Sequence, residues 1–132
     1  METTEFIFPE NVVTAFTDAD CDVLALALAK QTGLPLMAVA GENGGYLHCG
    51  LLLTEDLVVD IEGIHDAGEW VDRWAEYATT DDLIEMGDID GWEWAGEESE
   101  AAFRTKYEGE PHTEEGEHAD EYAKQIVSLL GL

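Results

Sequence analysis

The chain has 132 residues and carries 31 acidic against 5 basic residues, a formal net charge of −26 with histidine neutral. Hydrophobic residues make up 45% of the chain and charged residues 27%, which is typical of a folded globule and excludes a disordered acidic tail. The scarcity of Lys and Arg excludes direct binding to nucleic-acid phosphates and argues against an anionic membrane surface as a partner.

The length fits a single domain over residues 1–132. Residues 87–121 hold 13 of the 31 acidic residues, so we expect a core of about residues 1–86 and an acidic C-terminal lobe of about residues 87–132. The acidic start excludes a signal peptide, and no apolar run reaches the roughly 20 residues of a membrane helix. We expect a cytoplasmic protein with reduced cysteines, and the sequence sets no oligomeric state.

The first third of the chain predicts one short strand and one helix. The apolar run at residues 6–8 ends at Pro9 and predicts a strand. Asp20 precedes an Ala/Leu-rich segment that Gly33 ends, which predicts a helix over about residues 20–32. That helix is apolar almost all round, so we expect it to be buried.

The middle of the chain predicts a sheet followed by helices. Three apolar segments separated by turn residues predict consecutive strands over residues 35–40, 46–53 and 57–61. Apolar residues at helical spacing predict a helix over about 67–78 and a last one over about 115–130. The short connections favour an antiparallel sheet with helices packed on it, which is an α+β fold.

Three residues could carry chemistry: Cys21, His48 and Asp60. Cys21 begins the predicted helix, where unpaired backbone N–H groups and the helix dipole lower the pKa of a thiol. His48 and Asp60 lie on neighbouring predicted strands. A three-residue loop would place these two directly opposite each other, a five-residue loop diagonally on one face, and a loop of two or four residues on opposite faces. A His–carboxylate contact would orient the imidazole as the base for the thiol.

These residues resemble the papain-like fold, in its compact Cys-His-Asp branch of NlpC/P60- and transglutaminase-like proteins. The resemblance covers about residues 17–75: Asp20-Cys21 opening a helix, His48 on a following strand, and Asp60 in Val-Asp-Ile-Glu-Gly on the next. It implies an N-terminal helix packed on an antiparallel sheet, with Cys21 as nucleophile, His48 as base and Asp60 as the residue that orients the base. Members are peptidases, amidases, deamidases, acyl transferases and inactive binding proteins.

The resemblance implies a cysteine-dependent hydrolase or acyl transferase acting on an amide or thioester, with no cofactor. Asp18, Asp20 and Asp22 flank the thiol, and their charges oppose the formation of a thiolate. Structural roles therefore stay open: Cys21 as a small core residue, His48 as a satisfied strand histidine and Asp60 as a turn residue.

Metal binding would use the same types of residue. The zinc-compatible residues are Cys21, His48, Cys49, His65 and Asp66. They show no CxxC or HxxxH spacing, and the acidic segments match no EF-hand pattern, so we expect no metal site.

The net charge of −26 needs its own explanation, because self-repulsion destabilises a compact chain. One hypothesis is a non-enzymatic DNA mimic whose carboxylates imitate phosphates and bind a basic nucleic-acid-binding partner. Phage-encoded inhibitors of restriction or CRISPR machinery work in this way, and residues 81–121 would form the surface here. A halophilic cytoplasm or a generally solvated surface would give the same composition.

Overall fold

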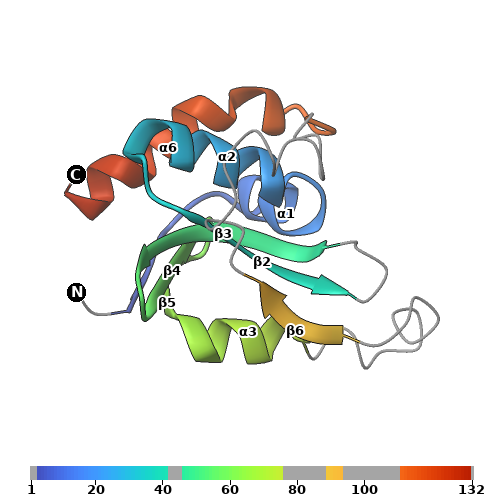
Figure 1. Cartoon of the computed structure of the whole chain (residues 1–132). Helices are drawn as coiled ribbons and strands as arrows, with labels where there is room; N and C mark the ends of the chain where they lie inside the picture. Colours follow the sequence, from blue (N-terminus) through green and yellow to red (C-terminus); the bar gives the residue numbers. More distant parts are fainter. Residues whose placement is uncertain (1–2, 42–45, 76–88, 94–110, 132) are drawn as a thin grey trace.

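The computed structural model describes residues 3–41, 46–75, 89–93 and 111–131. In chain order the elements are β1 (Thr4–Glu5), α1 (Glu10–Asp18), α2 (Cys21–Thr32), β2 (Leu36–Gly41), β3 (Tyr46–Thr54), β4 (Leu57–Asp60), β5 (Gly63–Asp66), α3 (Ala67–Ala75), β6 (Ile89–Glu93), the 3-10 helix η3 (Gly116–His118) and α6 (Ala119–Leu130). Helices α1, α2 and α6 lie on one side of a sheet and α3 on the other (Figure 1). The architecture is therefore three layers, with the sheet in the middle.

The sheet has six strands in the order β1-β5-β4-β3-β2-β6. Every neighbouring pair is antiparallel, so the predicted α+β class with an antiparallel sheet is confirmed. Strands β2 to β5 are neighbours in both sequence and space, as their short connections require. Helix α2 covers this part of the sheet and brings its first residue, Cys21, over β3.

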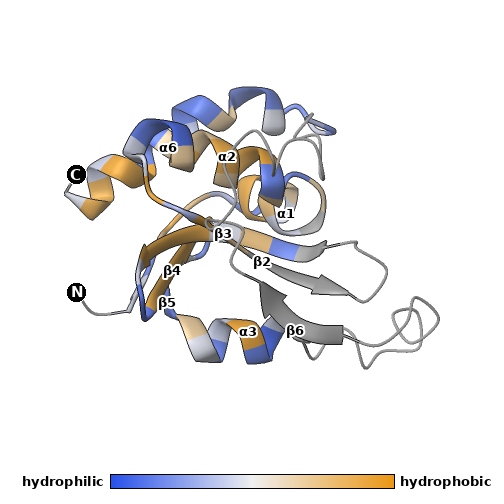
Figure 2. Cartoon of the chain, viewed as in Figure 1, coloured by the Kyte–Doolittle hydropathy of each residue, from blue (hydrophilic) through white to orange (hydrophobic). Residues whose placement is uncertain are grey.

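The sheet separates two apolar cores. The larger core lies under α1, α2 and α6 and includes Phe16, Leu28, Leu51 and Ile126. The smaller core lies under α3 and includes Trp70 together with residues of β2, β3 and β4. Hydrophobic residues follow α2 and the central strands, whereas the outer helices mix both kinds (Figure 2). Both faces of the central strands are thus buried, and a polar residue there needs a partner.

Helix α6 joins the larger core, although the sequence places it in an acidic lobe. Its buried residues recur at helical spacing: Ala119, Ala123, Ile126 and Leu130. Strand β6 likewise pairs with β2 within the sheet. Two parts of the expected lobe therefore complete the domain, and residues 94–110 lie outside the described residues.

Most elements predicted from the sequence are confirmed. Helix α2 ends at Thr32, and Gly33 follows in the left-handed conformation with φ of 74°. This is the conformation that glycine adopts without steric cost, and its N–H bonds to Ala29 O. The three strands predicted over residues 35–61 and the start of α3 at Ala67 are also present. The end of that predicted helix, residues 76–78, lies outside the described residues.

The strand predicted over residues 6–8 is wrong. Strand β1 is Thr4–Glu5, because these are the residues that pair with β5, and Ile7 is 98% exposed. The sequence patterns also missed α1 and β5. Within the described ranges, no helix has the length and the apolar character needed to span a bilayer.

Candidate active site

The expected contact between His48 and Asp60 is present. Leu51 lies opposite Val59 and Leu52 opposite Val58, a register that places His48 diagonally across from Asp60 on one face. Only two residues connect Thr54 to its partner Leu57, and such a loop alone would put the two side chains on opposite faces. The register shift between Leu52 and Thr54 returns them to one face. Nε2 of His48 lies 2.9 Å from Oδ2 of Asp60, and both side chains are buried.

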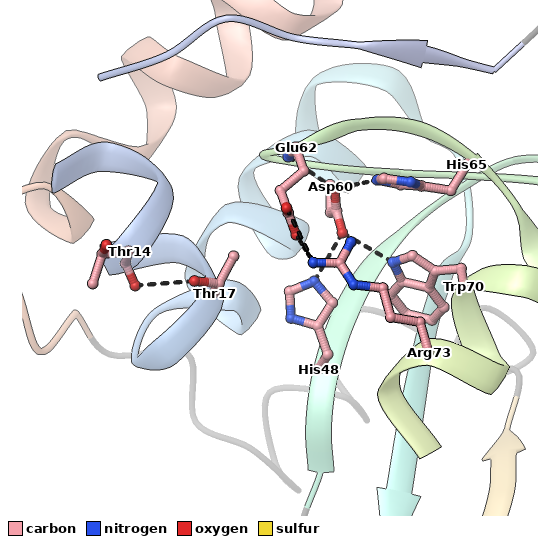
Figure 3. A network of polar contacts seen from close by, with 8 residues as sticks. All are labelled: Thr14, Thr17, His48, Asp60, Glu62, His65, Trp70 and Arg73. Carbon is pink, nitrogen blue, oxygen red and sulfur yellow. Dashed lines mark hydrogen bonds and ion pairs between the residues drawn. The ribbon is translucent and has the colours of Figure 1, made fainter. Parts of the chain in front are cut away.

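Asp60 is the centre of the polar network (Figure 3). Oδ2 accepts hydrogen bonds from Nε2 of His48 and from the indole N–H of Trp70 at 2.9 Å. Oδ1 accepts from Nε2 of His65 at 2.8 Å and from the backbone N–H of Glu62 at 2.9 Å. Burial raises the pKa of Asp60, but the hydrogen bonds from His48 and His65 and their charges outweigh it and hold the pKa far below its usual value. Asp60 is therefore an ionised, fully bonded anchor.

His48 is fixed in position on both sides. Its ring stacks on that of Trp74 with a centroid distance of 3.9 Å, and Trp70 lies 5.4 Å away. Because a carboxylate only accepts, Nε2 carries the proton toward Asp60. The buried Nδ1 has no hydrogen-bond partner among the described residues, so this nitrogen is the one available to a thiol. Burial lowers the pKa of His48, but the hydrogen bond with Asp60 and the charge of the neighbouring Cys21 raise it to about 9.

Cys21 is the first residue of α2 and is 5% exposed. A hydrogen bond from the thiol of Cys49 lowers the pKa of Cys21 most, and the neighbouring imidazole of His48 lowers it further. Burial and the charge of Asp22 act in the opposite direction, and the resulting pKa is about 6. Between about pH 6 and pH 9, Cys21 is therefore a thiolate beside an imidazolium.

The carboxylates that flank Cys21 oppose the thiolate less than expected. Oδ1 of Asp20 accepts from the backbone N–H of His112 at 2.8 Å. Its Oδ2 accepts from the backbone N–H of Thr113 at 2.9 Å and from the hydroxyl of the same residue. Asp20 thus anchors the segment before η3 to the start of α2. The charge of Asp22 does raise the pKa of Cys21, but the contacts with Cys49 and His48 outweigh it.

His65, Trp70 and Trp74 belong to the site, although the sequence patterns did not assign them to it. His65 lies opposite Val58 in the β4–β5 ladder, and Asp60 lies opposite Gly63. His65 therefore shares a face with Asp60, which only a prediction of β5 would have revealed. Both tryptophans come from α3, and their helical spacing predicted core packing alone.

The residues considered as zinc ligands are placed as follows. Cys21, His48 and Cys49 lie together, and His65 joins them through Asp60. Asp66 instead caps α3, because its Oδ2 accepts from the backbone N–H of Glu69 at 3.1 Å. In the part of the chain that the structure describes, no three or more of these side chains are arranged so that they could hold a metal ion.

A groove of about 580 Å³ lies beside the network, between β1, β5 and α3. His65 and Trp70 line it, together with Arg73, whose guanidinium bonds to Glu62 at 2.9 Å. Cys21 does not line this groove, nor the smaller ones between α2 and η3 and beside α1. The groove therefore borders His65 and Trp70, which bond to Asp60, and does not border Sγ of Cys21.

No protein-family model, curated protein or solved structure matches this chain. The functional inference therefore depends on the geometry and the charges of these residues.

The second predicted surface, residues 81–121, lies largely outside the described residues. Its described C-terminal part covers the segment before α6 and the first turn of that helix. Several carboxylates there are exposed: Glu114, Glu117, Asp120 and Glu121. Their charges lie on the opposite side of the sheet from α3.

Proposed function

We propose that the protein is a cysteine-dependent hydrolase or acyl transferase of papain-like fold, acting on an amide or thioester. One observation carries the proposal. The thiol of Cys21 adjoins His48, whose Nε2 is held by Asp60 at 2.9 Å and whose Nδ1 has no hydrogen-bond partner among the described residues. This is the nucleophile, base and orienting group that covalent catalysis requires.

The fold supports the papain-like part of the proposal. The chain runs from a buried helix that begins with the cysteine, through a strand with the histidine, to a neighbouring strand with the aspartate. Helix α2 packs on β3, and Cys21 and His48 shift each other's pKa. The three residues that the sequence selected lie on three packed elements, which supports the proposal.

The reaction would start with the thiolate of Cys21 attacking the carbonyl carbon of the substrate. The backbone N–H groups of the first turn of α2 have no partner within the helix, and they would stabilise the oxyanion. His48 would donate its Nδ1 proton to the leaving amine or thiol, which produces an acyl-Cys21 intermediate. Water activated by the now neutral imidazole would release the acid, and another nucleophile in its place would give acyl transfer.

The proposal is tested by acylation of the protein with a simple thioester and with an activated ester. Intact mass and peptide mapping should place the acyl group on Cys21, and the Cys21→Ala variant should not be acylated. His48→Gln and Asp60→Asn should lower the rate of acylation by at least about 100-fold. His118→Gln and Asp56→Asn, which change exposed residues of the same types, serve as matched controls. Equal acylation of the Cys21→Ala variant would refute the proposal.

The exposed carboxylates of residues 111–121 favour a second candidate, an acidic DNA mimic that inhibits a basic nucleic-acid-binding protein. This candidate predicts binding to such a protein that weakens steeply with salt and competes with duplex DNA. Replacing Glu114, Glu117 and Glu121 with Gln should weaken the binding, whereas Cys21→Ala should leave it unchanged. Failure to recover any basic partner at low salt would refute this candidate.

A further inference from the structure

The two cysteines of the chain lie side by side in the larger core. Cys21 begins α2, and Cys49 lies in β3 opposite Ala38. Both are buried free thiols of the apolar cluster in which α2 packs on β3, and the nearby Cys49 lowers the pKa of Cys21. The contact is a product of the tertiary structure, because α2 and β3 are separated by β2 in the chain.

The two thiols differ in reactivity. Cys21, with a pKa of about 6, is a thiolate at neutral pH. Burial raises the pKa of Cys49, and the adjoining Cys21 raises it further, so Cys49 stays protonated. Oxidants react with thiolates, so Cys21 reacts first. Cys49 is then in contact with the oxidised sulfur and can attack it.

We propose that Cys21 and Cys49 form a reversible intramolecular disulfide in response to a peroxide, and that this bond switches off the nucleophile of the site. Formation of the bond needs only the two thiols and the oxidant, whereas the switching-off rests on the proposed function. Cys21 is 5% exposed and Cys49 2%. This burial favours hydrogen peroxide, a molecule of four atoms, over a bulky disulfide as the oxidant.

The chemistry is balanced in two steps. The thiolate of Cys21 attacks one oxygen of hydrogen peroxide, so an S–O bond forms and the O–O bond breaks. The hydroxide that leaves takes the proton of the His48 imidazolium and becomes water. The sulfur of Cys49 then attacks Sγ of Cys21, so the S–S bond forms and the S–O bond breaks. The second hydroxide leaves with the thiol proton of Cys49 as water. Two thiols lose two electrons, and peroxide is reduced to two waters.

The test treats the reduced full chain with one equivalent of hydrogen peroxide at neutral pH. The monomer should lose the mass of two hydrogen atoms. Trypsin cleaves at Lys30 and Arg73 and so separates the two cysteines in sequence, and an unreduced digest should contain the two peptides linked. A dithiol reductant should restore the original mass. Retention of both thiols at a dose that oxidises a free-cysteine control would overturn the proposal.

Two variants separate the roles of the thiols. Cys49→Ser keeps a hydroxyl donor near Cys21 but cannot form a disulfide, so one equivalent of peroxide should add one oxygen atom to Cys21, and an excess should add two or three. Cys21→Ala should leave Cys49 unoxidised at the same dose. Oxygen added to Cys21 of the wild type while Cys49 stays reduced, or a disulfide between two chains, would overturn the proposal. A disulfide without any acylation of Cys21 would refute the proposed hydrolase while leaving the redox pair intact.

Discussion

His48 and His65 bind opposite oxygen atoms of a single carboxylate, that of Asp60, at 2.9 and 2.8 Å. Because a carboxylate only accepts, both imidazoles present a protonated Nε2 to it, which fixes the orientation of each ring. His48 is fully buried and His65 is 21% exposed, facing the groove beside α3. The position of the proposed base is therefore set partly by a histidine at the edge of a groove.

Replacing His65 with Phe should destabilise the protein and disturb the site. The change removes the donor to Oδ1 of Asp60 and leaves part of a buried charge unbonded, a loss of about 1–3 kcal/mol in the free energy of unfolding. His65→Gln, whose amide can still donate, should recover part of the loss. Urea unfolding measures the difference. Equal stability of the Phe and Gln variants would show that the bond to Asp60 contributes nothing.

The alkylation of Cys21 by iodoacetamide should depend on pH with a midpoint near 6. The thiolate is the reacting form, and its pKa is about 6, so the rate should rise through that pH and then stay level. His48→Gln removes the imidazolium and should move the midpoint upward. The midpoint is the quantity to compare, since burial slows the absolute rate equally at every pH. A wild-type midpoint above 8 would contradict the ion pair.

Gly50→Ala should destabilise the sheet beside the site. A Cβ at this position would lie 2.8 Å from Cγ1 of Val58, 2.9 Å from the carbonyl oxygen of Val59 and 3.3 Å from Cζ2 of Trp70. Relief of these contacts would shift the indole that bonds to Asp60, at a cost of about 1–3 kcal/mol in the free energy of unfolding. Gly68→Ala, where the nearest atom lies at 3.3 Å, is the matched control. A cost no larger than that of the control would contradict this packing.

Asp20→Ala should release the segment that precedes α6. The carboxylate is fully buried and accepts from the backbone of His112 and Thr113, so its loss leaves those N–H groups unbonded. Hydrogen exchange should quicken over residues 112–118 before the rest of the chain. Gly116→Ala should have a similar effect, because its Cβ would overlap Oδ2 of Asp20. Unchanged exchange in both variants would show that the anchor is dispensable.

The sequence predicted the elements whose signals are local. The Ala/Leu run that Gly33 ends predicted α2, and the alternation of faces in two strands predicted that His48 and Asp60 could meet. Strand β5 has only four residues, and pairing with β4 and β1 determines its conformation. Helix α1 follows Pro9 without a side-chain cap, so its start carries no capping signal.

The chemical state of the thiol also depends on contacts that the sequence does not display. Counting neighbouring charges along the chain indicates an unreactive Cys21. In the fold, Cys49 and His48 of strand β3 lie near Cys21. Their effect on the pKa of Cys21 outweighs that of Asp22. His65 escaped prediction for a related reason, since its link to Asp60 depends on the register of a strand that the sequence patterns missed.

The free energy of unfolding of the wild type should be nearly independent of pH between about 6.5 and 9. The pKa of His48 is raised from 6.5 to about 9, so between these pH values His48 is protonated in the folded state and neutral in the unfolded state. Its contribution is complete below pH 6.5 and falls by about 1.4 kcal/mol per pH unit as the pH rises toward 9. Cys21 has its pKa lowered from 9.0 to about 6, which gives a slope of the opposite sign. The two slopes cancel.

Cys21→Ser removes the contribution of Cys21 to the pH dependence of the free energy of unfolding and leaves that of His48. The imidazolium of His48 keeps its bond to Asp60, so the stability of this variant should fall as the pH rises from about 6.5, until His48 loses its proton. Without the thiolate that proton is lost below pH 9, which shortens the falling range. Asp60, whose pKa is lowered, stays ionised throughout and adds no slope. Urea unfolding at four or five pH values checks both curves, and a Cys21→Ser curve as flat as that of the wild type would refute the ion pair on which the proposed chemistry depends.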